Sequence, residues 1–142
     1  INRFSLDLKF TLKKTMKLTK KNKKIIVNLA INYGSKSEII QAIKKTGERF
    51  SVKKFETNLY TKGMSDPDIL IRTGGFKRLS NFLLWQSAYT ELFFLKKLWP
   101  DFNSIDLARI IRSYKKINRN YGKIWSQLIL KEEYLHRWVY YF

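Results

Sequence analysis

The chain has 142 residues, of which 44% are hydrophobic and 15% aromatic, and its 29 lysines and arginines exceed its 11 acidic residues by 18 charges. This length suits a single domain with one hydrophobic core. The absence of cysteine excludes disulfides and zinc–thiolate sites and fits a reducing cytoplasm, where we expect the protein. The sequence contains no run of about 18 apolar residues, so it holds no candidate for a membrane-spanning helix.

The net charge of +18 has two interpretations. It would attract anions, among them nucleic acids, diphosphates and anionic lipid headgroups. Alternatively, the many lysines, isoleucines and asparagines reflect an A/T-rich coding sequence. The basic run Lys20–Lys24 is predicted to be a solvated loop, with a nucleic-acid or headgroup patch as the alternative.

The first half of the chain shows one helix pattern, one strand pattern and a second helix pattern. Apolar residues mixed with lysines predict a helix from Arg3 to about Leu18. The short β-branched segment Ile25–Asn32 is typical of a central parallel strand. A turn at Tyr33–Ser35 precedes a predicted helix over Ser37–Arg49, with Ser35 or Ser37 as its N-cap. The buried face of this helix is predicted to contain Ile39, Ile40 and Ile43.

The second half continues the alternation. A small helix is expected around Glu56–Tyr60 and a buried strand at Ile69–Ile71. A helix over Phe82–Tyr89 is expected with Ser80 and Asn81 as its cap. A helix over Ser104–Lys116 that starts with Ser104 and Asp106, and a helical tail over Ile124–Phe142, complete the prediction. The tail has an aromatic end, which is expected to pack on the domain or a partner, or to contact a membrane surface. Alternating strands and helices predict an α/β fold with a mostly parallel sheet flanked by helices.

A basic, glycine-containing turn follows the strand at Ile69–Ile71. Arg72 and Thr73 end the apolar run, Gly74 and Gly75 permit a tight turn, and Lys77 and Arg78 add positive charge. Free backbone N–H groups, a helix N-terminus and bidentate arginines together suit phosphate oxygens, and the expected ligand is a diphosphate. The alternative is an ordinary turn with solvated arginines.

The longer string DxxIRTGGxxRLSNFLLWQxAYxEL, from Asp68 to Leu92, closely resembles the signature of the cis-prenyltransferases, the undecaprenyl diphosphate synthase family. The resemblance implies that Arg72, Arg78, Leu79 and Ser80 bind the diphosphate of isopentenyl diphosphate. It implies that Glu91 helps to hold Mg²⁺. Trp99–Phe102 resembles the family's ending of the next strand, which places that strand at about Glu91–Leu95.

The sequence also departs from the family pattern. Phe76 stands where the family usually has an acidic residue, Ser35 and Lys36 replace the end of an N-Y-G-G-R motif, and Asn120 occupies the position of an arginine that reaches the diphosphate across a subunit interface. No D-G-N-G-R-W-A phosphate loop with its catalytic aspartate is present. We therefore expect residues 1–142 to be the C-terminal portion of one cis-prenyltransferase domain whose sheet is truncated at its N-terminal side, with residues 123–142 as a helical aromatic tail and no catalytic residue in this chain.

The expected function is the condensation of isopentenyl diphosphate with an allylic diphosphate, such as farnesyl diphosphate, to a polyprenyl diphosphate that serves as a cell-wall lipid carrier. The resemblance also implies a homodimer that pairs around Phe82–Leu98. The mixed aromatic and basic residues of the tail add peripheral membrane contact as a further expectation. The fragment alone is expected to be inactive. The alternatives are a noncatalytic subunit of a heteromeric prenyltransferase and a basic nucleic-acid-binding protein, although no nucleic-acid partner is expected. The single histidine, His136, has no cluster of other ligands around it, so no catalytic or metal role is expected for it.

Overall fold

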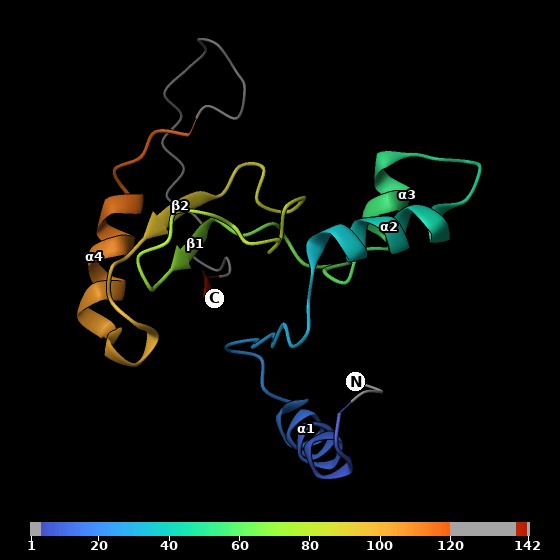
Figure 1. Ribbon diagram of the computed structural model, residues 1–142, viewed down its shortest axis with the longest axis horizontal. Coiled ribbons are helices and arrows are strands. Elements are labelled where there is room, and N and C mark those ends of the chain that lie inside the picture. Colours follow the sequence, from blue (N-terminus) through green and yellow to red (C-terminus); the bar gives the residue numbers. More distant parts are fainter. Residues whose placement is uncertain (1–3, 120–138, 142) are drawn as a thin grey trace. The chain divides into compact units, whose positions relative to one another are not determined.

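A computed structural model describes residues 4–119 and 139–141 (Figure 1). The chain folds as two units, residues 1–32 and residues 33–142. The first unit contains helix α1 (Leu6–Thr19), which begins after the N-cap Ser5 and confirms the helix predicted there. The second unit contains, in chain order, α2 (Ser35–Thr46), α3 (Val52–Glu56), β1 (Ile69–Arg72), β2 (Glu91–Phe94), the 3₁₀ helix η1 (Trp99–Asp101), α4 (Ser104–Tyr114) and β3 (Val139–Tyr141).

The second unit contains the parallel sheet that the sequence predicts. Its strand order is β2-β1-β3, and β1 runs parallel to both neighbours. Ile69 pairs with Glu91 at one end of β1 and Arg72 pairs with Phe94 at the other. The short apolar run of β1 suits a strand that is buried on both faces. The α/β fold class is therefore confirmed.

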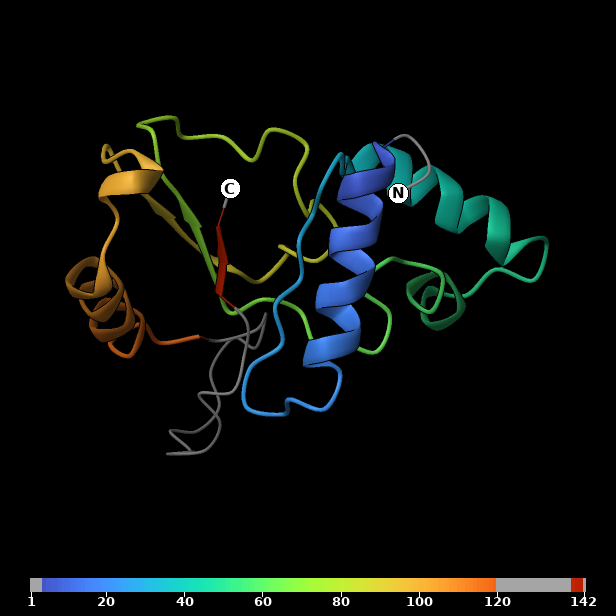
Figure 2. The same ribbon diagram turned by 90° about the horizontal axis from the view of Figure 1, so that it is seen from below.

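Helix α4 packs beside β1 and β2, as Figures 1 and 2 show. Ile69 and Ile71 on one face of β1 and Ile110 on α4 are all at least 96% buried. The partly buried side chains around them are Phe93, Leu95, Phe102, Leu107 and Tyr114. The N-cap of α4 is Asn103, and Asp106 completes a capping box with it, so α4 starts at the predicted place with one further residue as its cap.

The buried face of helix α2 matches the predicted one only in part, since Ile39 is partly buried and packs against the core but the other two predicted residues do not. Ile40 is 54% exposed and Ile43 is 50% exposed. The buried positions are Ser35, Glu38, Ala42 and Thr46. These small and polar side chains form a stripe along α2 that allows close packing against α3. Ala42 joins Phe55 and Leu59 in a second core cluster. Helix α3 itself begins earlier than predicted, because the Ser51 side chain caps it at the Lys54 N–H.

The strand predicted at Ile25–Asn32 is wrong. This segment is irregular, and Ile25, Val27 and Leu29 are 69–76% exposed. Its β-branched composition indicates only that the side chains would fit a pleated, half-buried surface. A strand also needs a hydrogen-bonded neighbour to form a ladder, and this segment forms none.

The helix predicted at Phe82–Tyr89 is also wrong, since the structure has turns there. Ser80, Asn81 and Leu83 all have positive φ, at +46°, +64° and +43°, which an α-helix does not accommodate. The Leu84 N–H donates to Ser35 Oγ at 3.0 Å, so a tertiary contact replaces a helical hydrogen bond.

The predicted helical tail lies mainly outside the described residues. Its described part, Val139–Tyr141, is strand β3 and not helix, because it pairs with β1. Within the residues that the structure describes, no helix combines the length and apolar character needed to cross a membrane.

Candidate functional site

The glycine turn after β1 is fixed by the end of β2. Gly74 and Gly75 have φ of +88° and +83°, and a Cβ at either position would meet nothing within 4 Å, so glycine is required by backbone conformation and not by space. The Gly74 N–H donates to the Lys97 carbonyl at 2.7 Å and the Gly75 N–H to the Leu95 carbonyl at 2.8 Å. The prediction that these two N–H groups bind an anion is therefore wrong, because both hold the turn to the segment that directly follows β2.

The predicted basic side chains do come together beside this turn. Arg72 Nη1 donates to Ser80 Oγ at 2.7 Å and to the backbone carbonyl of Arg78. The Arg78 guanidinium carbon lies 4.3 Å from the centre of the Phe76 ring, and that of Arg72 lies 5.7 Å from it. Leu79, half-buried, stands between Arg78 and Ser80 in the same loop. We call Arg72, Phe76, Arg78 and Ser80 the arginine cluster.

The loop after Ser80 is attached to the N-terminus of α2. The Asn81 carbonyl accepts from the Ser35 N–H at 2.8 Å, and Asn81 Oδ1 accepts from the Lys36 N–H at 2.8 Å. A Cβ on Gly34 would lie 2.9 Å from Asn81 Nδ2, so glycine allows this approach. Asn81 therefore caps α2, and the predicted caps Ser35 and Ser37 do not, because the helix begins at Ser35 after Gly34.

The electrostatic environment of the arginine cluster is positive. The sequence contains no acidic residue between Asp68 and Glu91. Arg78 and Lys77 are exposed in the loop, and exposed Lys36 follows the α2 N-terminus that Asn81 holds. Two guanidinium groups, with a hydroxyl in contact with that of Arg72, suit the oxygens of phosphate or diphosphate.

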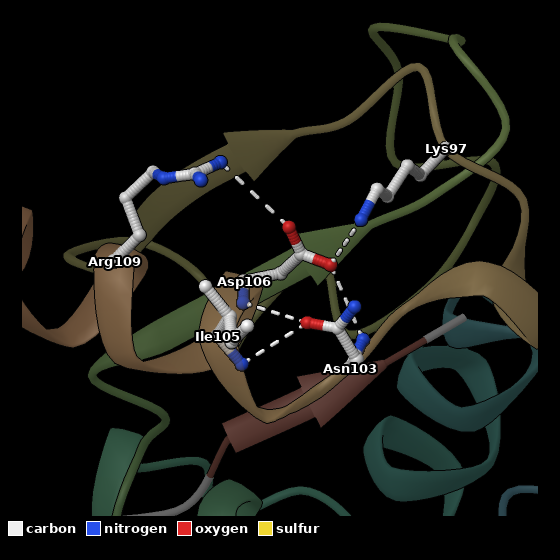
Figure 3. A network of polar contacts seen from close by, with 5 residues as sticks. All are labelled: Lys97, Asn103, Ile105, Asp106 and Arg109. Atoms are coloured by element: carbon white, nitrogen blue, oxygen red, sulfur yellow. Dashed lines mark hydrogen bonds and ion pairs between the residues drawn. The ribbon is translucent and has the colours of Figure 1, made fainter.

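A network of polar contacts supports the turn from the side of α4 (Figure 3). Lys97, whose carbonyl holds Gly74, also places its Nζ 2.7 Å from Asp106 Oδ2. Arg109 lies 3.7 Å from the other carboxylate oxygen, and the Asn103 N–H donates to Oδ2 at 3.2 Å. The hydrogen bond from Lys97 is the main cause that lowers the pKa of Asp106, which keeps this carboxyl ionised.

Glu91 lies at the other end of the strand pair from Arg72. It is the first residue of β2 and pairs with Ile69, whereas Arg72 pairs with Phe94 three residues further on. At about 3.3 Å per residue, this separates the two backbone positions by roughly 10 Å. The structure brings Arg72, Arg78 and Ser80 together, and it does not bring Glu91 to them within one chain.

The described residues do not make a magnesium site by themselves. Among residues 4–119 and 139–141, no group of three or more histidines, cysteines or carboxylates could hold a metal ion. Mg²⁺ prefers near-octahedral oxygen coordination and is commonly held by one or two carboxylates together with waters and substrate phosphates, so Glu91 could supply one ligand and the others would come from elsewhere.

One buried carboxylate, Glu38, was not singled out by sequence reasoning. It is 1% exposed and accepts hydrogen bonds from the Tyr33 hydroxyl, from the Tyr60 N–H at 2.7 Å and from the Gln86 side-chain amide at 3.3 Å. Burial, followed by the hydrogen bond to Glu38, raises the pKa of the Tyr33 phenol well above its ordinary value. The signal in the sequence was the spacing of Ser35, Glu38 and Ala42, which places Glu38 on one helical face with small residues.

A separate cavity of about 360 Å³ lies beside α3. Glu56, Asp66 and Trp85 are among its lining residues, and none of the arginine cluster lines it. Burial, with the charge of Glu56 as a second cause, raises the pKa of Asp66.

Comparison with known proteins agrees with this geometry. The family model described as putative undecaprenyl diphosphate synthase matches residues 1–122. An isoprenyl transferase of Oceanobacillus iheyensis is 44% identical in an alignment of 119 residues, and the match covers 77% of this chain and 47% of that protein. The ditrans,polycis-undecaprenyl-diphosphate synthase ((2E,6E)-farnesyl-diphosphate specific) of Haemophilus influenzae is 42% identical over 132 residues, covering 86% of this chain and 55% of that protein. The chain thus spans about half the length of the curated relatives it matches.

Solved structures give the same result. A lavandulyl diphosphate synthase from Lavandula x intermedia, in complex with dimethylallyl diphosphate, matches with a TM-score of 0.80 and 34% identity, over 86% of this chain and 57% of that one. A probable undecaprenyl diphosphate synthase from Campylobacter jejuni matches with a TM-score of 0.74 and 34% identity, over 86% of this chain and 59% of that one. With the matched family model, the close relatives and the shared fold, the chain belongs to the undecaprenyl diphosphate synthase family of cis-prenyltransferases.

Proposed function

We propose that this chain binds the diphosphate of isopentenyl diphosphate in a cis-prenyltransferase that extends an allylic diphosphate, such as farnesyl diphosphate, to a polyprenyl diphosphate. The observation that carries the proposal is the convergence of Arg72, at the end of β1, with Arg78 and Ser80 in the positively charged loop that follows. Family membership and the names of the relatives support the reaction type.

The residues of this chain act by holding one substrate in place. The guanidinium groups of Arg72 and Arg78 donate in-plane N–H groups to diphosphate oxygens, and the Ser80 hydroxyl adds a further donor. Isopentenyl diphosphate keeps its diphosphate while its double bond forms the new carbon–carbon bond, as the diphosphate of the allylic substrate leaves with cleavage of the allylic C–O bond and a proton is lost to restore a double bond. Fixing the diphosphate of isopentenyl diphosphate therefore restrains its double bond near the allylic carbon, which lowers the entropic part of the barrier.

Binding of inorganic pyrophosphate and of isopentenyl diphosphate tests the proposal by calorimetry with the 142-residue chain. Arg78→Ala should weaken binding by one to two orders of magnitude, because a hydrogen bond to a charged group contributes about 1.5–3 kcal/mol. Arg112→Ala, which removes an exposed arginine from α4, is the matched control and should bind like the wild type. Unchanged affinity in the Arg78 variant, or no binding by the wild type, would contradict the proposal.

In this proposal, it is the assembled enzyme that requires Mg²⁺. Glu91 is proposed as one Mg²⁺ ligand, with the other ligands supplied from outside the described residues, and no reaction step is assigned to the metal here. The chain alone should therefore bind diphosphate without forming product from radiolabelled isopentenyl diphosphate, farnesyl diphosphate and Mg²⁺. Product formation would contradict the claim that the metal site of this chain is incomplete. It would not contradict the proposed diphosphate site.

Two alternative functions make different predictions. A noncatalytic subunit would have no need of Arg72, Arg78 and Ser80, so their presence favours a substrate-binding role. The charge of +18 favours binding to a polyanion, and a nucleic-acid-binding protein would retain a DNA duplex with an affinity that falls steeply with salt. Pyrophosphate that displaces the duplex from the arginine cluster, and from no other part of the chain, would support the diphosphate site. Duplex binding that Arg78→Ala leaves unchanged would support the nucleic-acid-binding alternative.

We further propose that the enzyme acts in the cytoplasm with peripheral contact to the membrane.

A further inference from the structure

We propose that Phe76 is a positioning residue, whose ring orients the guanidinium group of Arg78 for a diphosphate ligand. This inference rests on the proposed diphosphate site. It assigns a role to a side chain at which the sequence departs from the family signature.

The geometry of the ring and the two arginines carries the inference. The Arg78 guanidinium carbon lies 4.3 Å from the centre of the Phe76 ring, and the Arg72 carbon lies 5.7 Å from it. Both distances lie within the range of about 6 Å at which a cation is attracted to the face of an aromatic ring. A single ring thus contacts both cations of the arginine cluster.

The two arginines differ in how they are held. Arg72 is partly buried and is anchored through Ser80 Oγ and the Arg78 carbonyl. Arg78 is exposed, and its guanidinium is restrained by the ring contact. A long side chain loses rotamer freedom when it binds a ligand, so a ring that restrains Arg78 beforehand reduces this loss.

Stacking on a ring restrains a guanidinium without occupying its hydrogen-bond donors. When a guanidinium lies parallel to a ring, its N–H groups point outward in the guanidinium plane and remain available to a ligand. A carboxylate at this position would accept those N–H groups and neutralise charge, but the phenylalanine ring does neither. Phe76 is 52% exposed, so its role in a hydrophobic core is limited.

Ring-retaining and ring-removing substitutions test this role in the 142-residue chain. Phe76→Leu removes the ring without changing charge, and it should raise the Kd for inorganic pyrophosphate about two- to fivefold. Phe76→Trp keeps an aromatic face and should bind as tightly as the wild type. In an Arg78→Ala background, Phe76→Leu should have a smaller effect, because the closer cation is gone and only the longer contact with Arg72 remains. The Arg78 Nε–Hε resonance should also lose its ring-current shift in Phe76→Leu.

The outcomes separate this inference from the proposed function. If the wild type binds pyrophosphate and Phe76→Leu binds equally well, Phe76 has no positioning role, although the diphosphate site stands. If Phe76→Leu weakens binding by the same factor with and without Arg78, the ring does not act through Arg78. If the wild type does not bind, the proposed function fails and this inference fails with it. An unchanged thermal unfolding midpoint in Phe76→Leu shows that the fold is intact.

Discussion

Arg119 and Asp68 form an ion pair with 2.6 Å between Nη1 and Oδ1, although they are 51 positions apart in the sequence. Both side chains are largely buried, at 14% and 13% exposure. Arg119 also donates to the Tyr114 hydroxyl and to the Tyr89 carbonyl, each at 2.6 Å. It thereby joins the chain after α4 to the residue before β1 and to the loop before β2. Its neighbour Asn120, at the expected position of the family arginine, lies outside the described residues.

Removing Arg119 should destabilise the second unit more than any surface arginine does. Arg119→Ala leaves Asp68 as an unpaired, mostly buried carboxylate, which costs about 3 kcal/mol. Arg119→Lys keeps the charge but cannot reproduce three contacts from one planar fork, so an intermediate loss is expected. The free energy of unfolding in urea measures both effects, with Arg112→Ala as the control. Equal stability of the Arg119→Ala and Arg112→Ala variants would show that the Arg119–Asp68 ion pair does not stabilise the fold.

The Lys97–Asp106 pair should make stability depend on pH in the acid range. Because Lys97 lowers the pKa of Asp106 in the folded state, the pair contributes stability above the ordinary carboxyl pKa of about 4 and loses it as the pH falls through the lower folded value. Lys97→Met should therefore be less stable than the wild type at pH 5–7, and the difference should shrink below about pH 4. Urea unfolding across this range measures it. Lys96→Met, at the exposed neighbouring position, should show no such pH dependence. A difference that is constant down to pH 2 would contradict this role.

Asn81 offers a graded test of the contact between the arginine loop and α2. Asn81→Asp keeps the cap acceptor and tolerates positive φ, so its stability should be near that of the wild type. Asn81→Gly keeps the backbone conformation but loses the cap. Asn81→Ala loses the cap and adds strain at φ +64°, so it should cost about 1 kcal/mol more than the glycine variant. Thermal unfolding should rank the variants in this order, and an alanine variant as stable as the aspartate variant would contradict it.

Elements that depend on local pattern could be predicted from the sequence. Strand β1 is a short β-branched run, and α4 has apolar residues at helical spacing, so both were expected near their observed bounds. Arg72, Arg78 and Ser80 were also expected together, since a single turn separates them. These features need little information from distant parts of the chain.

Features fixed by distant contacts could not be predicted. The Gly74 and Gly75 N–H groups bind carbonyls about twenty residues later, so they are not available to an anion. The turns over residues 82–89 arise because Asn81 and Leu84 bind the start of α2. Ile25–Asn32 has the composition of a strand, but its conformation depends on a partner strand that local sequence does not supply.

We propose that two copies of the chain pair through the region Phe82–Leu98. Tyr89, Leu92 and Leu98 are 61%, 41% and 62% exposed, and β2 is an edge strand of the described sheet. Exposed aromatic and aliphatic side chains of this kind are typical of permanent interfaces. Such pairing would also bring Glu91, which starts β2, toward a second copy.

Sedimentation of the chain at micromolar concentration should therefore show a dimer. Leu92→Lys places a charge on the proposed interface and should shift the equilibrium to monomer, because burying an unpaired charge is costly. Ile105→Lys is the matched control: Ile105 is 65% exposed on α4, outside Phe82–Leu98, and this variant should remain dimeric. The competing explanation is that other parts of the family fold cover these side chains within one subunit. A monomeric wild type, or equal dissociation in both lysine variants, would exclude the Phe82–Leu98 interface and confine Glu91 to its own subunit.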